Sequence, residues 1–295
     1  MRKKFYGIIA PIVTPFDAEG VIDSMALQSE TRYLLDSGVH GLSIGGSTGE
    51  GALLSDDELD LCIRTIQQEN TEKKPLLCGI IRNSTKDAIR AGLRAREAGA
   101  DGLMVTPTYY HGTDDQGNTI FFKELAGAVE LPIIIYNVID RNPVSPLLMM
   151  DLAEIEHVIG IKQSINGLHG LNAMISACGD RTLVFGAQDD LLFCSYLLGA
   201  VGAISAILTV FPELCVRQWN AVQSMDIEEA RQISFRLLPV WQLIGSAGMA
   251  FPGRIKAVLE LLGRQSGLSR SPVMKPSQDV IGQLRSALEK QELLP

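Results

Sequence analysis

Short apolar runs recur along the chain about every 30 residues, the length of one strand-plus-helix unit. The runs are rich in Val, Ile and Leu and cover residues 7–13, 41–44, 76–81, 102–105, 133–136, 158–162, 182–185 and 202–207. Between them, apolar residues recur at helical spacing, most clearly in 56–69, 85–98 and 168–177, and Ser55 and Ser84 stand at expected N-cap positions. This alternation predicts eight parallel strands, each followed by a helix.

Eight such units take up roughly 240 residues, close to the usual length of a (β/α)₈ barrel. We therefore predict an α/β fold, a (β/α)₈ TIM barrel with a C-terminal helical extension. Residues 1–210 would supply the strands and most helices, and residues 211–295 the final barrel helix and a C-terminal helical segment of the same domain. A doubly wound sheet is the competing architecture, but the turn at Thr14-Pro15-Phe16 carries no G-x-G-x-x-G.

Charge and hydropathy narrow the classes of partner. The net charge is −8, and no Lys/Arg cluster occurs beyond Arg2-Lys3-Lys4, so we expect no nucleic-acid partner. The uncharged stretch 191–212 is long enough to span a bilayer. Gly199 and Gly202 near its centre instead predict a turn between a buried helix and a buried strand, so we expect no membrane span. Two prolines interrupt the apolar run after the N-terminus, which argues against a secretory signal.

Cysteine and histidine spacing argues against disulfides and metal sites. The five cysteines form no C-x-x-C pair and are odd in number; they are Cys62, Cys78, Cys178, Cys194 and Cys215. The four histidines show neither H-x-H nor H-E-x-x-H spacing. We expect buried thiols in a reducing cytoplasm and no metal cofactor.

Polar residues at the ends of apolar runs are the first candidates for chemistry, because barrel enzymes carry their reactive groups at the C-terminal ends of strands. Lys162 ends one run and could serve as an amine nucleophile, or reach solvent, or pair with a carboxylate. Tyr136 ends the run before it and is either a proton relay or a core aromatic. Asp189 and Asp190, after the seventh run, are paired carboxylates or the N-cap of the next helix.

The glycine-rich segment 45–50 follows the second predicted strand. Its glycines would let backbone N–H groups approach a carboxylate, and Ser47 and Thr48 would add hydroxyl groups. The segment also matches G-x-S-x-G, the nucleophile turn of serine hydrolases. Those enzymes need a histidine late in the chain, and none follows His169, which argues against a hydrolase.

Four motifs together resemble the dihydrodipicolinate synthase and N-acetylneuraminate lyase superfamily of pyruvate-dependent Schiff-base enzymes. Gly46–Glu50 is similar to its G-[TS]-T-G-E turn, and Val105–Tyr110 to its T-P-x-Y-Y segment. Tyr136–Val138 is similar to its Y-N-[VI] strand end, and Gly160–Lys162 to its G-[IL]-K. The resemblance covers nearly the whole chain. It implies a TIM barrel that uses a lysine imine instead of a cofactor, with pyruvate and an aldehyde as substrates.

The resemblance also implies roles for single residues. Lys162 would form the Schiff base, and Tyr136 would shuttle protons with Ser47 and Tyr110. Tyr110 would come from a neighbouring subunit, which implies a homo-oligomer, a dimer or a tetramer. The remaining positions implied are Thr48 and Gly46 for the pyruvate carboxylate, Arg141 for the carboxylate of the synthases' second substrate, and Gly186 and Ile204 for the pocket lining.

Departures from the family pattern leave the branch of the family open. Ser47 and Gln163 look like the lyase branch, whereas Arg141 looks like the synthase branch. We expect a Schiff-base lyase or aldolase that forms or cleaves a carbon bond next to pyruvate. The alternatives are a dihydrodipicolinate synthase acting on pyruvate and aspartate semialdehyde, a deoxy-oxo sugar acid dehydratase or deaminase, and a non-catalytic 2-oxo acid sensor. Contacts of Asp189 or Asp190 with sugar hydroxyls stay open.

Overall fold

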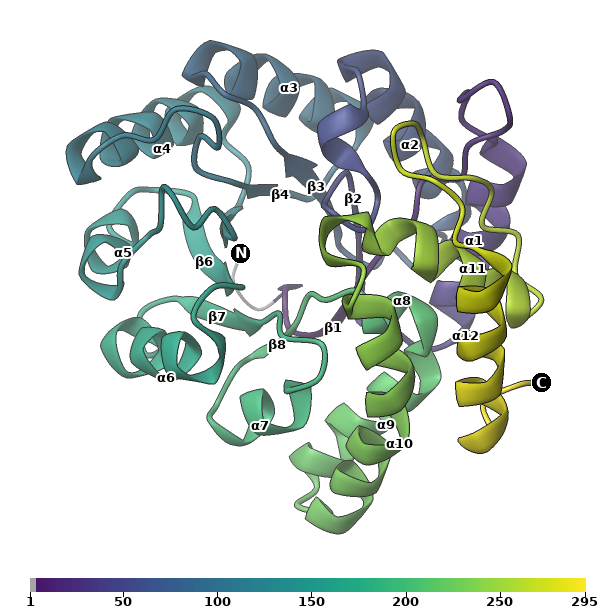
Figure 1. Ribbon diagram of the computed structural model, residues 1–295. Helices are drawn as coiled ribbons and strands as arrows, with labels where there is room; N and C mark the ends of the chain where they lie inside the picture. Colours follow the sequence, from purple (N-terminus) through teal and green to yellow (C-terminus); the bar gives the residue numbers. More distant parts are fainter. Residues whose placement is uncertain (1–3) are drawn as a thin grey trace.

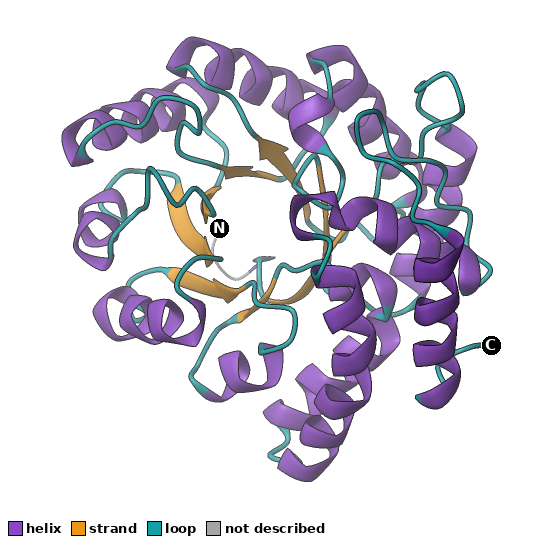
Figure 2. Ribbon diagram, viewed as in Figure 1, coloured by secondary structure: helices purple, strands orange, loops and turns teal. Residues whose placement is uncertain are grey.

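The computed structural model describes residues 4–295, so Arg2 and Lys3 of the N-terminal basic cluster lie outside the described residues. Eight parallel strands close into one barrel in the order β1 to β8. Helices surround the barrel on its outer side (Figures 1 and 2). The predicted (β/α)₈ architecture is confirmed.

The strands are β1 Gly7–Pro11, β2 Gly41–Ile44, β3 Leu76–Ile80, β4 Gly102–Val105, β5 Ile133–Asn137, β6 Val158–Gln163, β7 Leu183–Gly186 and β8 Gly202–Ala203. The helices that follow the strands are α1 Ser24–Asp36, α2 Asp56–Glu69, α3 Thr85–Ala98, α4 Asp115–Val129, α5 Pro146–Leu152, α6 Gly167–Cys178 and α7 Leu192–Leu197, and the four-residue α8 Ile207–Val210 follows β8. After them come α9 Pro212–Gln223, α10 Ile227–Gly245, α11 Phe251–Leu261 and α12 Gln278–Lys290, with short 3₁₀ turns η2 Gly51–Leu53 and η3 Gly248–Ala250.

The helix starts follow local capping chemistry. The Ser55 side chain accepts the backbone N–H of Glu58, and the Glu58 carboxylate accepts the N–H of Ser55, which makes a complete capping box for α2. Ser84 accepts the N–H of Asp87 at the start of α3. The predicted bounds of both helices are confirmed, and α6 is one residue longer at each end than predicted.

Strand β8 differs most from its prediction, because it ends at Ala203 and not at Ile207. Ile207 begins α8, and its backbone N–H donates to Asp189 Oδ1 at 2.7 Å. The strand begins where β8 meets β1, and there a Cβ on Gly202 would lie 2.1 Å from the backbone oxygen of Gly7. Only glycine fits this approach of the two backbones.

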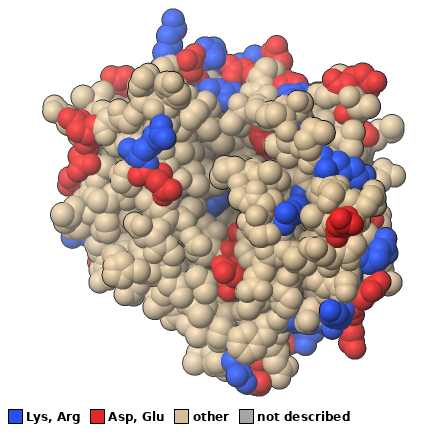
Figure 3. All heavy atoms as spheres, viewed as in Figure 1, with Lys and Arg blue, Asp and Glu red and all other residues tan. Residues whose placement is uncertain are grey.

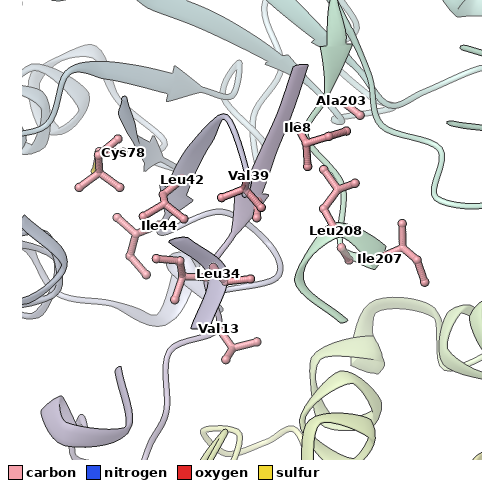
Figure 4. Packing of buried hydrophobic residues seen from close by; sticks show 14 of the residues in the cluster. Ile8, Val13, Leu34, Val39, Leu42, Ile44, Cys78, Ala203, Ile207 and Leu208 are labelled. Carbon is pink, nitrogen blue, oxygen red and sulfur yellow. The ribbon is translucent and has the colours of Figure 1, made fainter. Parts of the chain in front are cut away.

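Two apolar layers hold the barrel. Strand side chains alternate between the barrel interior and the layer under the helices. The interior cluster is Phe5, Ile9, Leu77, Met104, Ile134, Tyr136, Ile159, Phe185 and Ile204. The outer cluster includes Ile8, Leu42 and Leu208, which pack between strands and helices (Figure 4). The interior is therefore filled by side chains, and open space is left at its mouth.

In the uncharged stretch 191–212, the predicted turn joins α7 to β8, whereas α8 was not predicted. Over residues 4–295, the helices are too short or too polar to cross a bilayer. The face seen in Figure 3 carries Lys and Arg interspersed with Asp and Glu, and the basic side chains do not gather into a patch there.

Candidate active site

A cavity of about 250 Å³ lies at the barrel mouth. Its polar lining follows the strand ends and comprises Ser47, Thr48, Tyr136, Lys162, Ser164, Asp189 and Ser205. The C-terminal part of the chain adds Trp241, Met249 and Phe251 from α10, η3 and α11. Figure 1 shows this segment beside the barrel opening. The cavity thus has polar walls from the barrel and an apolar side from the extension.

Lys162 lies near the end of β6 and is only 6% exposed. Its neighbour across the strand pair is Tyr136 of β5, and Lys162 Nζ lies 3.8 Å from the centre of the Tyr136 ring. Within residues 4–295, Lys162 makes no ion pair with a carboxylate. The amine therefore faces the cavity next to an aromatic face, and is not held in a structural salt bridge.

Tyr136 and Ser47 are brought together although 89 residues separate them. Ser47 Oγ and Tyr136 Oη lie 3.1 Å apart, and either hydroxyl can be the donor. Tyr136 is 4% exposed, so the pair is shielded from bulk solvent. Two adjacent hydroxyls next to an amine can pass a proton to a molecule bound in the cavity.

The glycine-rich turn follows β2 and brings Thr48 to the cavity. Its path is tight, because a Cβ on Gly51 would lie 1.7 Å from the backbone oxygen of Gly45. The Gly51 N–H donates to Gly46 O at 2.9 Å, which closes the turn. Ser47 and Thr48 of this turn therefore line the same cavity as Lys162.

Asp189 is half-buried in the cavity wall and does not cap α7, whose N-cap is Leu191 without a side-chain hydrogen bond. That part of the prediction is wrong, because the carboxylate turns instead toward the Ile207 N–H. Burial raises the pKa of Asp189 to about 6, against the opposing effects of that N–H and of Lys162. Asp190 is exposed.

Comparison with known proteins identifies the family. The model of the dihydrodipicolinate synthetase family matches residues 4–291. The chain belongs to this family. Members of the dihydrodipicolinate synthetase family are pyruvate-dependent lyases and synthases, which confirms the enzyme class expected from the motifs.

Relatives and solved structures extend over the same length. A 4-hydroxy-tetrahydrodipicolinate synthase of Methanopyrus kandleri is 34% identical over 294 residues, which cover 98% of this chain and 97% of the relative. YagE from E. coli K12, a family protein solved with pyruvate, has a TM-score of 0.92 at 29% identity and covers 98% and 99% of the two chains. A dihydrodipicolinate synthase variant described as the first monomeric one has a TM-score of 0.93 at 27% identity and covers 99% of each.

Five predicted positions of the family pattern lie outside the cavity lining, and Gly46 is one of them. Tyr110 is 67% exposed and packs edge-on against His111, with ring centres 4.8 Å apart. Arg141 is exposed on the loop after β5. Gly186 ends β7, and Ile204 packs in the barrel interior below the cavity. Lys162, Tyr136, Ser47 and Thr48 are the predicted residues that the structure brings together.

Sequence reasoning missed several lining residues. Ser164 and Ser205 have buried hydroxyls without a hydrogen-bond partner among the described residues. Ser164 lies two residues after the apolar run that ends at Lys162, so a search beyond the run ends would have found it. Ser205 lies inside the predicted run 202–207 and follows a strand end only because β8 stops at Ala203. Trp241, Met249 and Phe251 carry no comparable local signal, because only the fold brings the extension over the barrel mouth.

The serine-hydrolase alternative fails on geometry. Ser47 Oγ lies next to a tyrosine hydroxyl, and the cavity lining of the described chain contains no histidine to act as its base. The five cysteines are free thiols; four are buried and Cys194 is half-buried.

Proposed function

We propose that this family member is a Schiff-base lyase or aldolase in which Lys162 forms an imine with pyruvate or a related 2-oxo acid. The observation that carries the proposal is the place of Lys162, which is buried at a strand end, forms no ion pair with a carboxylate of residues 4–295, and lies next to the Tyr136–Ser47 hydroxyl pair. A buried, unpaired amine is costly in a folded protein and is typical of a nucleophile.

The reaction follows from these positions. The Lys162 amine attacks the 2-oxo carbon, water leaves, and the resulting iminium accepts the electron pair of the carbon bond that breaks beside it. In the direction of bond formation the carbon next to the iminium loses a proton, and the enamine that forms attacks the carbonyl carbon of an aldehyde. Tyr136 moves the proton with Ser47, while Thr48 and the N–H groups around Gly46 hold the carboxylate. The imine takes the place of a Lewis acid, so we propose that no metal cofactor takes part.

The polar wall of the cavity favours a partner that carries hydroxyl groups. Asp189, Ser205 and Ser164 line the cavity together, and the Ser164 hydroxyl has no hydrogen-bond partner among residues 4–295, whereas Arg141 does not line the cavity. Buried hydroxyls without partners are satisfied when a ligand brings its own. A deoxy-oxo sugar acid is therefore the favoured class. The synthase reaction with aspartate semialdehyde is the second candidate, supported by the synthase names of the relatives.

One pair of variants separates these candidates. Asp189→Asn keeps an acceptor for the Ile207 N–H but removes the negative charge of the carboxylate. If that charge binds substrate hydroxyls, kcat/KM for a hydroxylated oxo acid should fall by roughly 10- to 100-fold. The variant should leave kcat/KM for an acidic, hydroxyl-free aldehyde nearly unchanged. Arg141→Ala should lower kcat/KM for the acidic aldehyde, and spare the hydroxylated oxo acid, only if the enzyme catalyses the synthase reaction. The measurement is pyruvate release or consumption on a panel of aldehydes and oxo sugar acids.

The assembly and the compartment complete the proposal. The exposed Tyr110 ring is free to reach a neighbouring subunit, so we propose a homo-oligomer, a dimer or a tetramer, in which it completes the relay. Free thiols fit a reducing compartment, and we propose the cytoplasm.

A further inference from the structure

A buried ion pair joins the C-terminal extension to the glycine-rich turn. Lys256 of α11 donates to Glu50 Oε1 at 2.7 Å, and the two side chains are 3% and 2% exposed. In the sequence 206 residues separate them. Glu50 is the last residue of the turn that carries Ser47 and Thr48, so the contact reaches from the extension into the proposed carboxylate site.

The pair is fully satisfied by its surroundings. The Lys256 ammonium has three N–H donors, and besides Glu50 they reach Thr14 O and Leu268 O, each at 2.6 Å. The other Glu50 oxygen accepts the Arg270 N–H at 2.9 Å. Burial lowers the pKa of Lys256, and the Glu50 carboxylate opposes that effect. The geometry of Glu50 is therefore fixed from several sides.

Backbone hydrogen bonds couple the position of Glu50 to the rest of the turn. Glu50 has φ +55°, a left-handed conformation that a residue with a side chain keeps only when its surroundings hold it. Its N–H donates to Ser47 O at 3.1 Å. The Thr14 hydroxyl, next to the Lys256 acceptor, donates to Gly49 O at 2.7 Å. A displacement of Glu50 would thus displace the donors between Ser47 and Gly49.

We propose that the Glu50–Lys256 pair positions the turn that binds the 2-oxo acid carboxylate, so that the C-terminal extension sets the affinity for pyruvate. This inference rests on the proposed function. Both are positioning residues that act through Ser47 and Thr48. Their loss should act on pyruvate binding and leave the chemistry at Lys162 intact once pyruvate is bound.

The chain offers a matched control. Glu30 of α1 and Arg264 form a second buried pair, with side chains 1% and 6% exposed. Arg264 also donates to Thr209 O and Val210 O, and neither residue lines the cavity. If the Glu50–Lys256 pair serves stability alone, breaking either pair should lower stability and leave pyruvate binding unchanged. If it positions the turn, only its loss should also weaken pyruvate binding.

The experiment uses the full-length chain and four forms of it: wild type, Glu50→Gln, the double variant Glu50→Gln/Lys256→Met, and Glu30→Gln. Borohydride trapping of pyruvate on Lys162 gives the half-saturating pyruvate concentration and the maximal trapped fraction, and thermal melting gives Tm. We expect Glu50→Gln and the double variant to raise the half-saturating pyruvate concentration about 10-fold or more, which corresponds to a tenfold weaker binding constant. The maximal trapped fraction should stay unchanged. Glu30→Gln should lower Tm and leave half-saturation within about 2-fold.

The double variant keeps the test decisive if Glu50→Gln does not fold, because removing both charges leaves no unpaired buried ion. Unchanged half-saturation in Glu50→Gln, or its recovery together with Tm in the double variant, would reduce the pair to a structural role. A wild type that traps no pyruvate would instead overturn the proposed function, and the positioning role with it.

Discussion

Lys162→Ala should lower kcat roughly 10⁴-fold or more, because removal of the nucleophile from other enzymes that work through a covalent intermediate lowers kcat by at least this factor. No other amine lines the cavity of the described chain, so no neighbouring group can form the imine in its place. The fold should persist, because within the described part of the chain Lys162 makes no ion pair that the substitution would break. The measurement is pyruvate release or consumption at saturating substrate, with circular dichroism to check folding.

Lys123→Ala is the matched control, because Lys123 is an exposed lysine on α4 away from the cavity. It should keep the wild-type rate. Activity of Lys162→Ala within about 10-fold of wild type would show that the reaction does not pass through this amine.

Tyr136→Phe should lower kcat by roughly 10²- to 10⁴-fold, the usual contribution of general acid–base catalysis. The ring stays against Lys162 Nζ, but the hydroxyl that lies 3.1 Å from Ser47 Oγ is lost. Imine formation should continue slowly, so pyruvate trapping should survive while turnover falls. Single-turnover kinetics would separate the two steps.

Tyr196→Phe is the control for removal of a buried tyrosine hydroxyl. The Tyr196 hydroxyl has no hydrogen-bond partner in the described part of the chain, and its ring packs against Trp219. Its removal should leave turnover unchanged. Equal, small effects of the two substitutions would make Tyr136 a packing residue.

The barrel could be predicted from sequence because its signals are local. Apolar runs of strand length and capping serines such as Ser55 depend on neighbours a few residues away. The end of β8 could not be predicted in this way. The N–H of Ile207 finds its acceptor on Asp189, 18 residues earlier, and this contact starts a helix where the apolar run suggested a continuing strand.

The candidate site likewise has one part that could be predicted from local sequence and one part that could not. Lys162 and Tyr136 follow strand ends, and the topology of a parallel barrel then brings them together. The apolar side of the cavity comes from the extension, and the Glu50–Lys256 pair joins residues 206 positions apart. Such contacts form only when the chain is folded, so they cannot be predicted from the spacing of residues along the sequence.

The central claim is that pyruvate binds covalently to Lys162, and reductive trapping tests it most directly. Borohydride added together with pyruvate reduces an imine to a stable amine, and peptide mapping by mass spectrometry locates the modified residue. The account predicts one adduct, on Lys162, that requires pyruvate and is absent from Lys162→Ala. An adduct on a different lysine, or none on an enzyme that turns over pyruvate, would contradict it.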